Sequence, residues 1–302
     1  MEVPVTVVGE ALIDIVIPPA GASVEHVGGS PANVAIGLAR LGHPTRLATH
    51  IGRDARGQRI AALMEAEHVE LAPGSRDAER TPTAAAHLDP AGVASYQFDL
   101  DWRLDPAQVV VPMDAHLHTG SIAATLPPGG AAVLEIVRAA REHATISYDP
   151  NARPTLMGSP DQARPVIERL IALADVVKAS EEDVRWLYGT DPIPQVLAHW
   201  AALGPSVCAV TQGGEEVIVL AAGEVQRYPT LPTRVADTVG AGDTFFSAAL
   251  TFLYEHGYLS DRNRLAGITS DALSTCLTFA SKAAAINCTR EGADPPYRSD
   301  LD

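Results

Sequence analysis

The chain has 302 residues, 46 % of them hydrophobic and 20 % charged, and carries a net charge of −15. These values predict a soluble globular α/β protein, and the negative charge argues against nucleic acid or anionic membrane as a partner. The start of the chain lacks a basic leader and no uncharged apolar run reaches the length of a membrane span, so we expect a cytoplasmic protein.

Short β-branched runs alternate with helical patterns, which is typical of βαβ units on a largely parallel sheet. In the first such helix Val34, Leu38 and Leu41 share one face. The predicted strands are 3–9, 12–18, 46–51, 145–148, 176–178, 207–211 and a hairpin of 217–220 with 225–228. The predicted helices are 33–41, 56–66, 131–143, 181–188, 194–203, 241–256 and 271–286.

A second hairpin interrupts this rhythm. Residues 83–88 and 95–100 read as strands joined by a turn at 90–92, and 12–16 and 26–28 can pair with them. We interpret 11–28 and 82–104 as a small β lid on a single domain of residues 1–302. The alternative is an edge extension of the main sheet.

The late segment 237–243, Asp-Thr-Val-Gly-Ala-Gly-Asp, opens an apolar helix. Gly240, Ala241 and Gly242 leave backbone N–H groups free at the positive end of that helix, where they attract an anion. Asp243 then places a carboxylate within one turn, and an anion hole beside a proton acceptor suits phosphoryl transfer to a hydroxyl. The plain alternative is a capped helix start.

Two common nucleotide motifs do not account for this segment. Phe245 stands at the third glycine position of a Rossmann fingerprint, and the sequence contains no GxxxxGK[ST] loop. An earlier segment, 28–35, pairs the diglycine Gly28-Gly29 with Asn33. Glycines let the backbone approach a polyhydroxylated ligand, and an amide donates to and accepts from hydroxyls. Alone, this pattern also fits a turn and a helix cap.

Together the two segments resemble the signatures of the ribokinase-like (PfkB-type) carbohydrate kinases, most closely the fructokinases. The resemblance covers nearly the whole chain, and the Asp-Pro-Asn-Ala-Arg-Pro run at 149–154 is similar to a segment of keto-sugar kinases. It implies a three-layer α/β/α fold with a mostly parallel sheet and a small β lid. It also implies transfer of a phosphoryl group from ATP to a primary hydroxyl of a sugar.

The resemblance assigns roles to residues by position. Asp243 is implied as the catalytic base and Gly240, Ala241 and Gly242 as the anion hole, with Arg153 adding a guanidinium. The sugar-binding residues that it implies are Asp14, Gly28, Gly29, Asn33, Tyr96 and Phe98. Asp14 can equally be a strand-end acid facing solvent, and Tyr96 and Phe98 can equally pack the lid itself.

The nucleotide side is assigned in the same way. The residues implied to bind ATP are Lys178, Ser180, Thr211, Gly213, Gly240, Gly242 and Ser281. Mg²⁺ is expected near the acids 181–183, with Asp183 as the named ligand, because magnesium is held largely through water and phosphate oxygens. Asp237 is implied as a ligand of a monovalent cation such as K⁺. His116 and His118, two apart on a strand, lack a third metal ligand and are interpreted as structural.

Several alternatives stay open at this point. The acceptor can be fructose, 2-keto-3-deoxygluconate, ribose or a nucleoside. A different class of function is a catalytically silent sensor of sugar or nucleotide. The resemblance also implies a possible homodimer through the lid.

Overall fold

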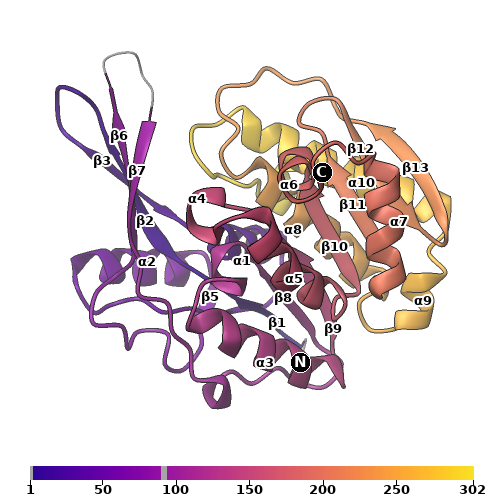
Figure 1. The fold of residues 1–302 in the computed structure, drawn as a ribbon, viewed down its shortest axis with the longest axis horizontal. Helices are drawn as coiled ribbons and strands as arrows, with labels where there is room; N and C mark the ends of the chain where they lie inside the picture. The colour runs from indigo at the N-terminus through magenta and orange to yellow at the C-terminus, as the bar shows by residue number, and fades with distance from the viewer. Residues whose placement is uncertain (1–2, 90–93) are drawn as a thin grey trace.

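The computed structural model describes residues 3–89 and 94–302. Its main feature is a nine-stranded sheet with the order β13-β12-β11-β10-β9-β8-β1-β4-β5 (Figure 1). Seven of these strands, β11 through β5 in that order, pair in parallel, and β12 and β13 extend the sheet as an antiparallel hairpin. The predicted mostly parallel sheet and its terminal hairpin are confirmed.

The strands are Val5–Val8 (β1), Leu12–Ile17 (β2), Val24–Gly28 (β3), Thr45–Ala48 (β4), Val69–Leu71 (β5), Thr83–Leu88 (β6), Ala94–Asp99 (β7), His116–Gly120 (β8), Thr145–Asp149 (β9), Val176–Ser180 (β10), Val207–Thr211 (β11), Glu216–Ala221 (β12) and Glu224–Pro229 (β13). The α-helices are Ser30–Arg40 (α1), Ala55–Ala66 (α2), Gly129–Arg141 (α3), Pro154–Met157 (α4), Pro160–Ile171 (α5), Glu181–Tyr188 (α6), Ile193–Leu203 (α7), Ala241–Glu255 (α8), Arg262–Ala266 (α9) and Ser270–Cys288 (α10). Short 3₁₀ turns occupy Pro106–Gln108, Ile122–Ala124 and Arg298–Asp300.

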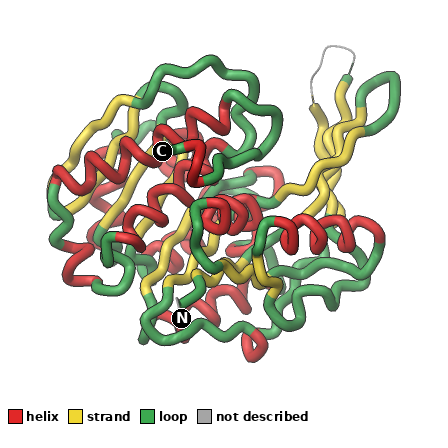
Figure 2. Tube along the Cα trace, turned by 180° about the vertical axis from the view of Figure 1, so that it is seen from behind, coloured by secondary structure: helices red, strands yellow, loops and turns green. Residues whose placement is uncertain are grey.

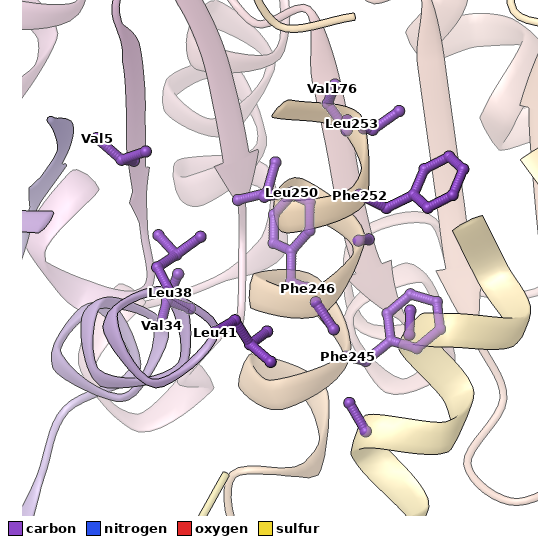
Figure 3. Packing of buried hydrophobic residues seen from close by; sticks show 14 of the residues in the cluster. Val5, Val34, Leu38, Leu41, Val176, Phe245, Phe246, Leu250, Phe252 and Leu253 are labelled. Atoms are coloured by element: carbon purple, nitrogen blue, oxygen red, sulfur yellow. The ribbon is translucent and has the colours of Figure 1, made fainter. Parts of the chain in front are cut away.

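Helices cover both faces of the large sheet, which gives three layers (Figure 2). On one face α1, α8 and α10 pack against the strands, and on the other α3, α5, α6 and α7 do so. The apolar stripe of α1 meets α8, a helix that is buried along most of its length (Figure 3). Burial of these side chains is the main stabilising term, at about 25 cal/mol per Å² of apolar surface.

A separate four-stranded sheet, with the order β3-β2-β6-β7, stands away from the large one (Figure 1). Strand β2 pairs antiparallel with β3 and parallel with β6, and β6 pairs antiparallel with β7. This small sheet shares no ladder with the large sheet, so the edge-extension alternative is wrong within the described residues. The turn predicted at 90–92 lies outside the described residues, and the lid role stays a prediction.

Several helices differ from the sequence-based expectation. Helix α1 begins at Ser30 rather than at 33, because Gly29 caps it with a φ of 109° and Pro31 suits the first turn. The short helices α4 and α9 and the longer α5 are absent from the prediction. Pro160 and Pro165 interrupt the pattern of α5. Among residues 3–89 and 94–302, no helix is long and apolar enough to cross a membrane.

Candidate active site

A cavity of about 770 Å³ opens where the small sheet faces the carboxyl ends of the large sheet's parallel strands. Open α/β sheets bind ligands at this edge. The predicted site residues that line it are Asp14, Gly29, Asn33, Tyr96, Phe98, Arg153, Lys178, Ser180, Asp183, Thr211, Gly213, Gly240, Ala241, Gly242, Asp243 and Ser281. The early and late sequence segments therefore share one cavity, as the sequence analysis requires. Gly28 and Asp237 are the two predicted residues that do not line it.

Asp243 lies in the first turn of α8 and is 7 % exposed. Its Oδ1 accepts a hydrogen bond from the Ser30 hydroxyl at 2.7 Å, and its Oδ2 accepts one from the Asn33 amide at 2.8 Å. The Asn151 amide donates to Oδ1 at 3.5 Å. Three neutral donors thus orient the carboxylate without neutralising it, which suits a group that has to accept a proton.

The segment from Val239 to Gly242, called the anion loop below, packs closely against its neighbours. Gly240 caps α8 with a φ of 73°, and a Cβ at this position would lie 2.5 Å from Ala293 Cβ. A Cβ on Gly242 would lie 2.9 Å from Lys178 Nζ. Because residues 240 and 242 are glycines, no side chain there covers the backbone N–H groups at the start of α8, and these groups can bind an anion.

Lys178 supplies a positive charge beside the anion loop. Lys178 lies in the middle of β10, its side chain is 6 % exposed, and its Nζ donates to Asp149 Oδ2 at 2.8 Å. Burial alone would lower the pKa of Lys178, but the adjacent Asp149 carboxylate raises it above its usual value. The ammonium therefore stays charged at the wall of the cavity.

The small sheet and the start of α1 form the other half of the cavity. Asp14 lies on β2 and lines this half of the cavity. Partial loss of solvent raises the pKa of its carboxyl, against the opposing charges of Arg153 and His26. A Cβ on Gly28 would lie 2.0 Å from Asp14 Oδ2. Gly28, predicted to bind sugar, thus stands behind Asp14 and leaves room for its carboxylate.

Two aromatic rings of β7 border the same half. The rings of Tyr96 and Phe98 stack with centroids 6.0 Å apart and planes at 12°. Tyr96 is 61 % exposed, so one face of the pair is open to a ligand. Arg153 lies nearby, and its guanidinium donates to Asn151 Oδ1 at 2.6 Å and to the carbonyls of Asn151 and Ala152.

The predicted metal ligands have other partners in the described structure. Asp183 forms a capping box with Ser180 at the start of α6, and its second oxygen accepts the Ala152 N–H at 2.7 Å. The neighbouring Glu182 is exposed and lines the cavity. The Asp237 carboxylate accepts the N–H groups of Val239 and Gly292, and these bonds lower its pKa.

The two strand histidines form part of a buried polar ladder. Each ring bonds to the Ser147 hydroxyl, at 2.8 Å for His116 and 2.9 Å for His118. Burial lowers the pKa of both rings to about 3, so they are neutral at pH 7. No group of three metal-ligating side chains occurs among residues 3–89 and 94–302.

Sequence reasoning did not single out three residues of the cavity. Ser30 and Asn151 donate hydrogen bonds to Asp243. Ser30 belongs to the 28–35 segment and Asn151 to the 149–154 segment, so the sequence signal was present in both motifs. Glu10 follows β1, is 5 % exposed, and its carboxylate accepts the Ala123 N–H at 3.1 Å. Burial raises the pKa of Glu10 to about 7.

Comparisons with known proteins agree with this geometry. The pfkB family carbohydrate kinase pattern matches residues 4–300. The fructokinase of Klebsiella pneumoniae is 33 % identical over 98 % of this chain and 97 % of its own length, and fructokinase-1 of Oryza sativa subsp. japonica is 31 % identical over 97 % and 94 %.

A solved structure described as fructokinase with bound ATP from Xylella fastidiosa superimposes with a TM-score of 0.84, covering 100 % of this chain and 97 % of that one. Its sequence is 24 % identical, so this similarity establishes the common fold. The resemblance drawn from the two motifs is confirmed by the full-length matches. The chain belongs to the pfkB family of carbohydrate kinases, and the two relatives compared above are named fructokinases.

Proposed function

We propose that the protein transfers the γ-phosphoryl group of ATP to a primary hydroxyl of a keto sugar, with fructose as the acceptor. The observation that carries this proposal is the single cavity in which Asp243 and the anion loop meet Asp14 and Asn33. The full-length similarity to fructokinases supports fructose as the first acceptor to test.

Asp243 is the proposed base. Its carboxylate takes the proton of the sugar hydroxyl as the oxygen attacks phosphorus in line with the departing ADP. Ser30 and Asn33 hold the carboxylate in place with bonds of 2.7 and 2.8 Å, so the reacting oxygen meets a fixed acceptor. A positioned base contributes a factor of about 10²–10⁴ to the rate.

The anion loop and Lys178 are proposed to balance the charge that accumulates on the transferring group. The N–H groups at residues 240–242 converge at the start of α8, and the Lys178 ammonium lies directly behind Gly242. Fixed donors in a partly dry site stabilise such charge without reorganising. Thr211, Gly213 and Ser281 border the remaining part of the cavity, which we assign to the nucleotide.

The sugar is proposed to lie between the small sheet and α1. The Asp14 carboxylate can accept two hydroxyl hydrogen bonds, and the Asn33 amide oxygen is free to accept another because its nitrogen is used by Asp243. The stacked rings of Tyr96 and Phe98 cover an apolar face of the sugar. In this role the small sheet acts as a lid.

The metal expected with ATP is Mg²⁺, and the donor set of the described residues fits it through an exposed carboxylate on the cavity wall. Glu182 would hold it through water, since Asp183 already accepts three hydrogen bonds from protein groups. When bound, the ion neutralises phosphate charge. Asp237 offers only oxygens that already accept N–H groups, so no step is assigned to a monovalent cation.

The deciding experiment is a panel of acceptors assayed by ADP release with the purified protein. Fructose, 2-keto-3-deoxygluconate, ribose and adenosine are compared by kcat/KM, and we expect fructose to be the best. An equal or higher value for 2-keto-3-deoxygluconate would replace fructose as the acceptor. If ATP and sugars bind in calorimetry but none of the acceptors stimulates ADP release, the protein is a sensor.

A further inference from the structure

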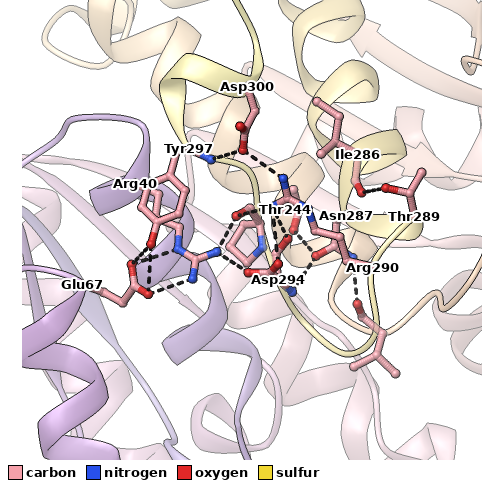
Figure 4. Close-up of polar contacts among 12 residues, drawn as sticks. Arg40, Glu67, Thr244, Ile286, Asn287, Thr289, Arg290, Asp294, Tyr297 and Asp300 are labelled. Atoms are coloured by element: carbon pink, nitrogen blue, oxygen red, sulfur yellow. Dashed lines mark hydrogen bonds and ion pairs between the residues drawn. The ribbon is translucent and has the colours of Figure 1, made fainter.

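Asn287 is the polar residue at the C-terminal end of α10 whose side chain is completely buried. Figure 4 shows it within a set of polar contacts that includes Thr244, Asp294 and Arg40. Its amide nitrogen donates to the Val239 carbonyl at 2.8 Å. Its amide oxygen accepts the Thr244 hydroxyl at 3.2 Å and the Asp294 N–H at 3.0 Å.

These partners bracket the residues proposed to act on phosphate. Val239 directly precedes Gly240, and Thr244 directly follows Asp243. One buried amide therefore holds both ends of the four residues that carry the anion hole and the base. Asn287 itself does not line the cavity, so it can influence the reaction only through the groups that it holds.

The segment after α10 closes the other side of this arrangement. Ala293 fills the space that a side chain on Gly240 would need, and the Asp294 N–H is one of the bonds to Asn287. The Asp294 carboxylate accepts from Arg40 at 2.5 Å. The same guanidinium binds both oxygens of Glu67 at 2.7 and 2.9 Å and lies 4.5 Å from the Tyr297 ring centroid.

Arg40 links this network to the sugar half of the cavity. It stands in the last turn of α1, the helix whose first turn carries Ser30 and Asn33. Its side chain is 11 % exposed, and the Glu67 and Asp294 carboxylates raise its pKa against the effect of burial. A doubly paired, buried guanidinium has a fixed geometry, because its planar donors satisfy several acceptors at once.

We propose that Asn287 is a positioning residue for phosphoryl transfer, which fixes the anion loop and Asp243 relative to each other and, through Asp294 and Arg40, relative to α1. The proposal rests on the proposed kinase function. It predicts that loss of the Asn287 contacts lowers kcat and weakens ATP binding. The KM for sugar should stay nearly unchanged, because the Arg40 pairs with Glu67 and Asp294 do not involve the Asn287 side chain and still hold α1 in place.

The test uses matched pairs of variants in the full-length protein. Asn287→Asp keeps the shape but replaces the donor to the Val239 carbonyl with a repelling oxygen. We expect kcat to fall about 10- to 100-fold, short of the 10²–10³-fold cost of removing an anion-hole donor outright. A matched pair of variants then compares Thr244→Val with Thr251→Val. Both residues are buried threonines of α8. The Thr251 hydroxyl has no hydrogen-bond partner among the described residues.

Thr244→Val should lower kcat severalfold, Thr244→Ser should recover most of it, and Thr251→Val should leave kcat within about twofold of the wild type. Equal losses for the two valine variants, or an Asn287→Asp variant with unchanged kcat, would overturn the proposal. A rise in the KM for sugar in both Asn287→Asp and Thr244→Val would also overturn the proposal.

Isothermal titration with ATP and Mg²⁺ separates this proposal from the assigned function. If the wild-type protein binds ATP but phosphorylates no sugar, the kinase function fails, and Asn287 is judged by the weakened ATP binding of its variant. If Asn287→Asp binds ATP as tightly as the wild type, the positioning role fails even where the kinase function holds. A wild-type protein that neither binds ATP nor phosphorylates sugar overturns both.

Discussion

The two halves of the cavity are built differently. The anion loop is held by the buried Asn287, by close packing of Gly240 on Ala293 and by the charged Lys178. The small sheet that forms the sugar half rests on a satellite cluster of three buried residues, Leu12, Ala84 and Ile122. The half around the anion loop is thus fixed by close packing and buried polar contacts, whereas the small sheet rests on a smaller set of buried contacts.

Loss of solvent and hydrogen bonding shift the pKa values of the carboxylates around the cavity in opposite directions. Loss of solvent raises the pKa values of Glu10 and Asp14 in the sugar half, and it raises that of Asp149 beside Lys178 to about 6. Backbone N–H groups lower the pKa of Asp237, which does not line the cavity. A raised pKa thus marks desolvated carboxylates in both halves.

The largest expected effect tests the residue where the halves meet. Asp243→Asn keeps the size of the side chain but removes the proton acceptor, so kcat should fall about 10²- to 10⁴-fold with a modest change in the KM for sugar. Steady-state ADP release against fructose measures both constants. Turnover close to that of the wild type would remove Asp243 from the mechanism.

The next effect compares two glycines of the anion loop. Gly240→Ala forces an L-residue to a φ of 73° and drives its Cβ into Ala293, whereas Gly242→Ala needs only the terminal ammonium of Lys178 to shift. We expect Gly240→Ala to lose about 1–2 kcal/mol of unfolding free energy from the strained φ alone, more with the clash, and Gly242→Ala to lose less. Urea unfolding measures the difference, and equal losses would show that the loop is not tightly packed.

Glu10, in the sugar half of the cavity, should make the stability of the protein depend on pH. The pKa of Glu10 rises from its usual 4.5 to about 7 on folding, so the unfolded state loses its proton first. This difference favours the native state fully below about pH 4.5. As the pH rises towards 7, the unfolding free energy falls by at most about 3 kcal/mol. Glu10→Gln should remove this loss.

The Tm of Glu10→Gln relative to the wild type should therefore increase between pH 5 and 8. His116 and His118, whose pKa values fall to about 3, act with the opposite sign but are present in both proteins, so their contribution cancels in the difference. A Tm difference that is independent of pH would contradict the assigned burial of Glu10.

The smallest expected effect on stability comes from the small sheet. Tyr96→Ala removes an exposed ring, so the unfolding free energy should change by about 0.5 kcal/mol or less. The KM for fructose should nevertheless rise severalfold, and kcat should stay within about threefold. Tyr258→Ala offers a control, because that tyrosine lies away from the cavity. An unchanged KM for Tyr96→Ala would leave the ring pair a packing role only.

Much of this arrangement follows from local patterns. The start of α8 and the terminal hairpin were predictable because glycines and alternating apolar residues mark them directly. Helix α5 was not, since Pro160 and Pro165 hide an apolar face that only packing reveals. Ser30 and Asn151 were missed as donors to Asp243 because the bonds join segments more than 90 residues apart. The sequence Ser-Glu-Glu-Asp at 180–183 suggested Asp183 as a magnesium ligand. The same spacing of Ser180 and Asp183 also forms a helix capping box, which is how the structure uses it.

One peptide connects the two halves directly. Strand β3 ends at Gly28, α1 begins at Ser30, and a Cβ on the intervening Gly29 would lie 2.4 Å from the Glu10 carbonyl oxygen. Gly29 is closely packed there, so the small sheet and the Ser30 hydroxyl that donates to Asp243 are separated by one residue with no room for a side chain. Under the proposed function, a larger residue at position 29 would therefore disturb the sugar site and the orientation of the base together.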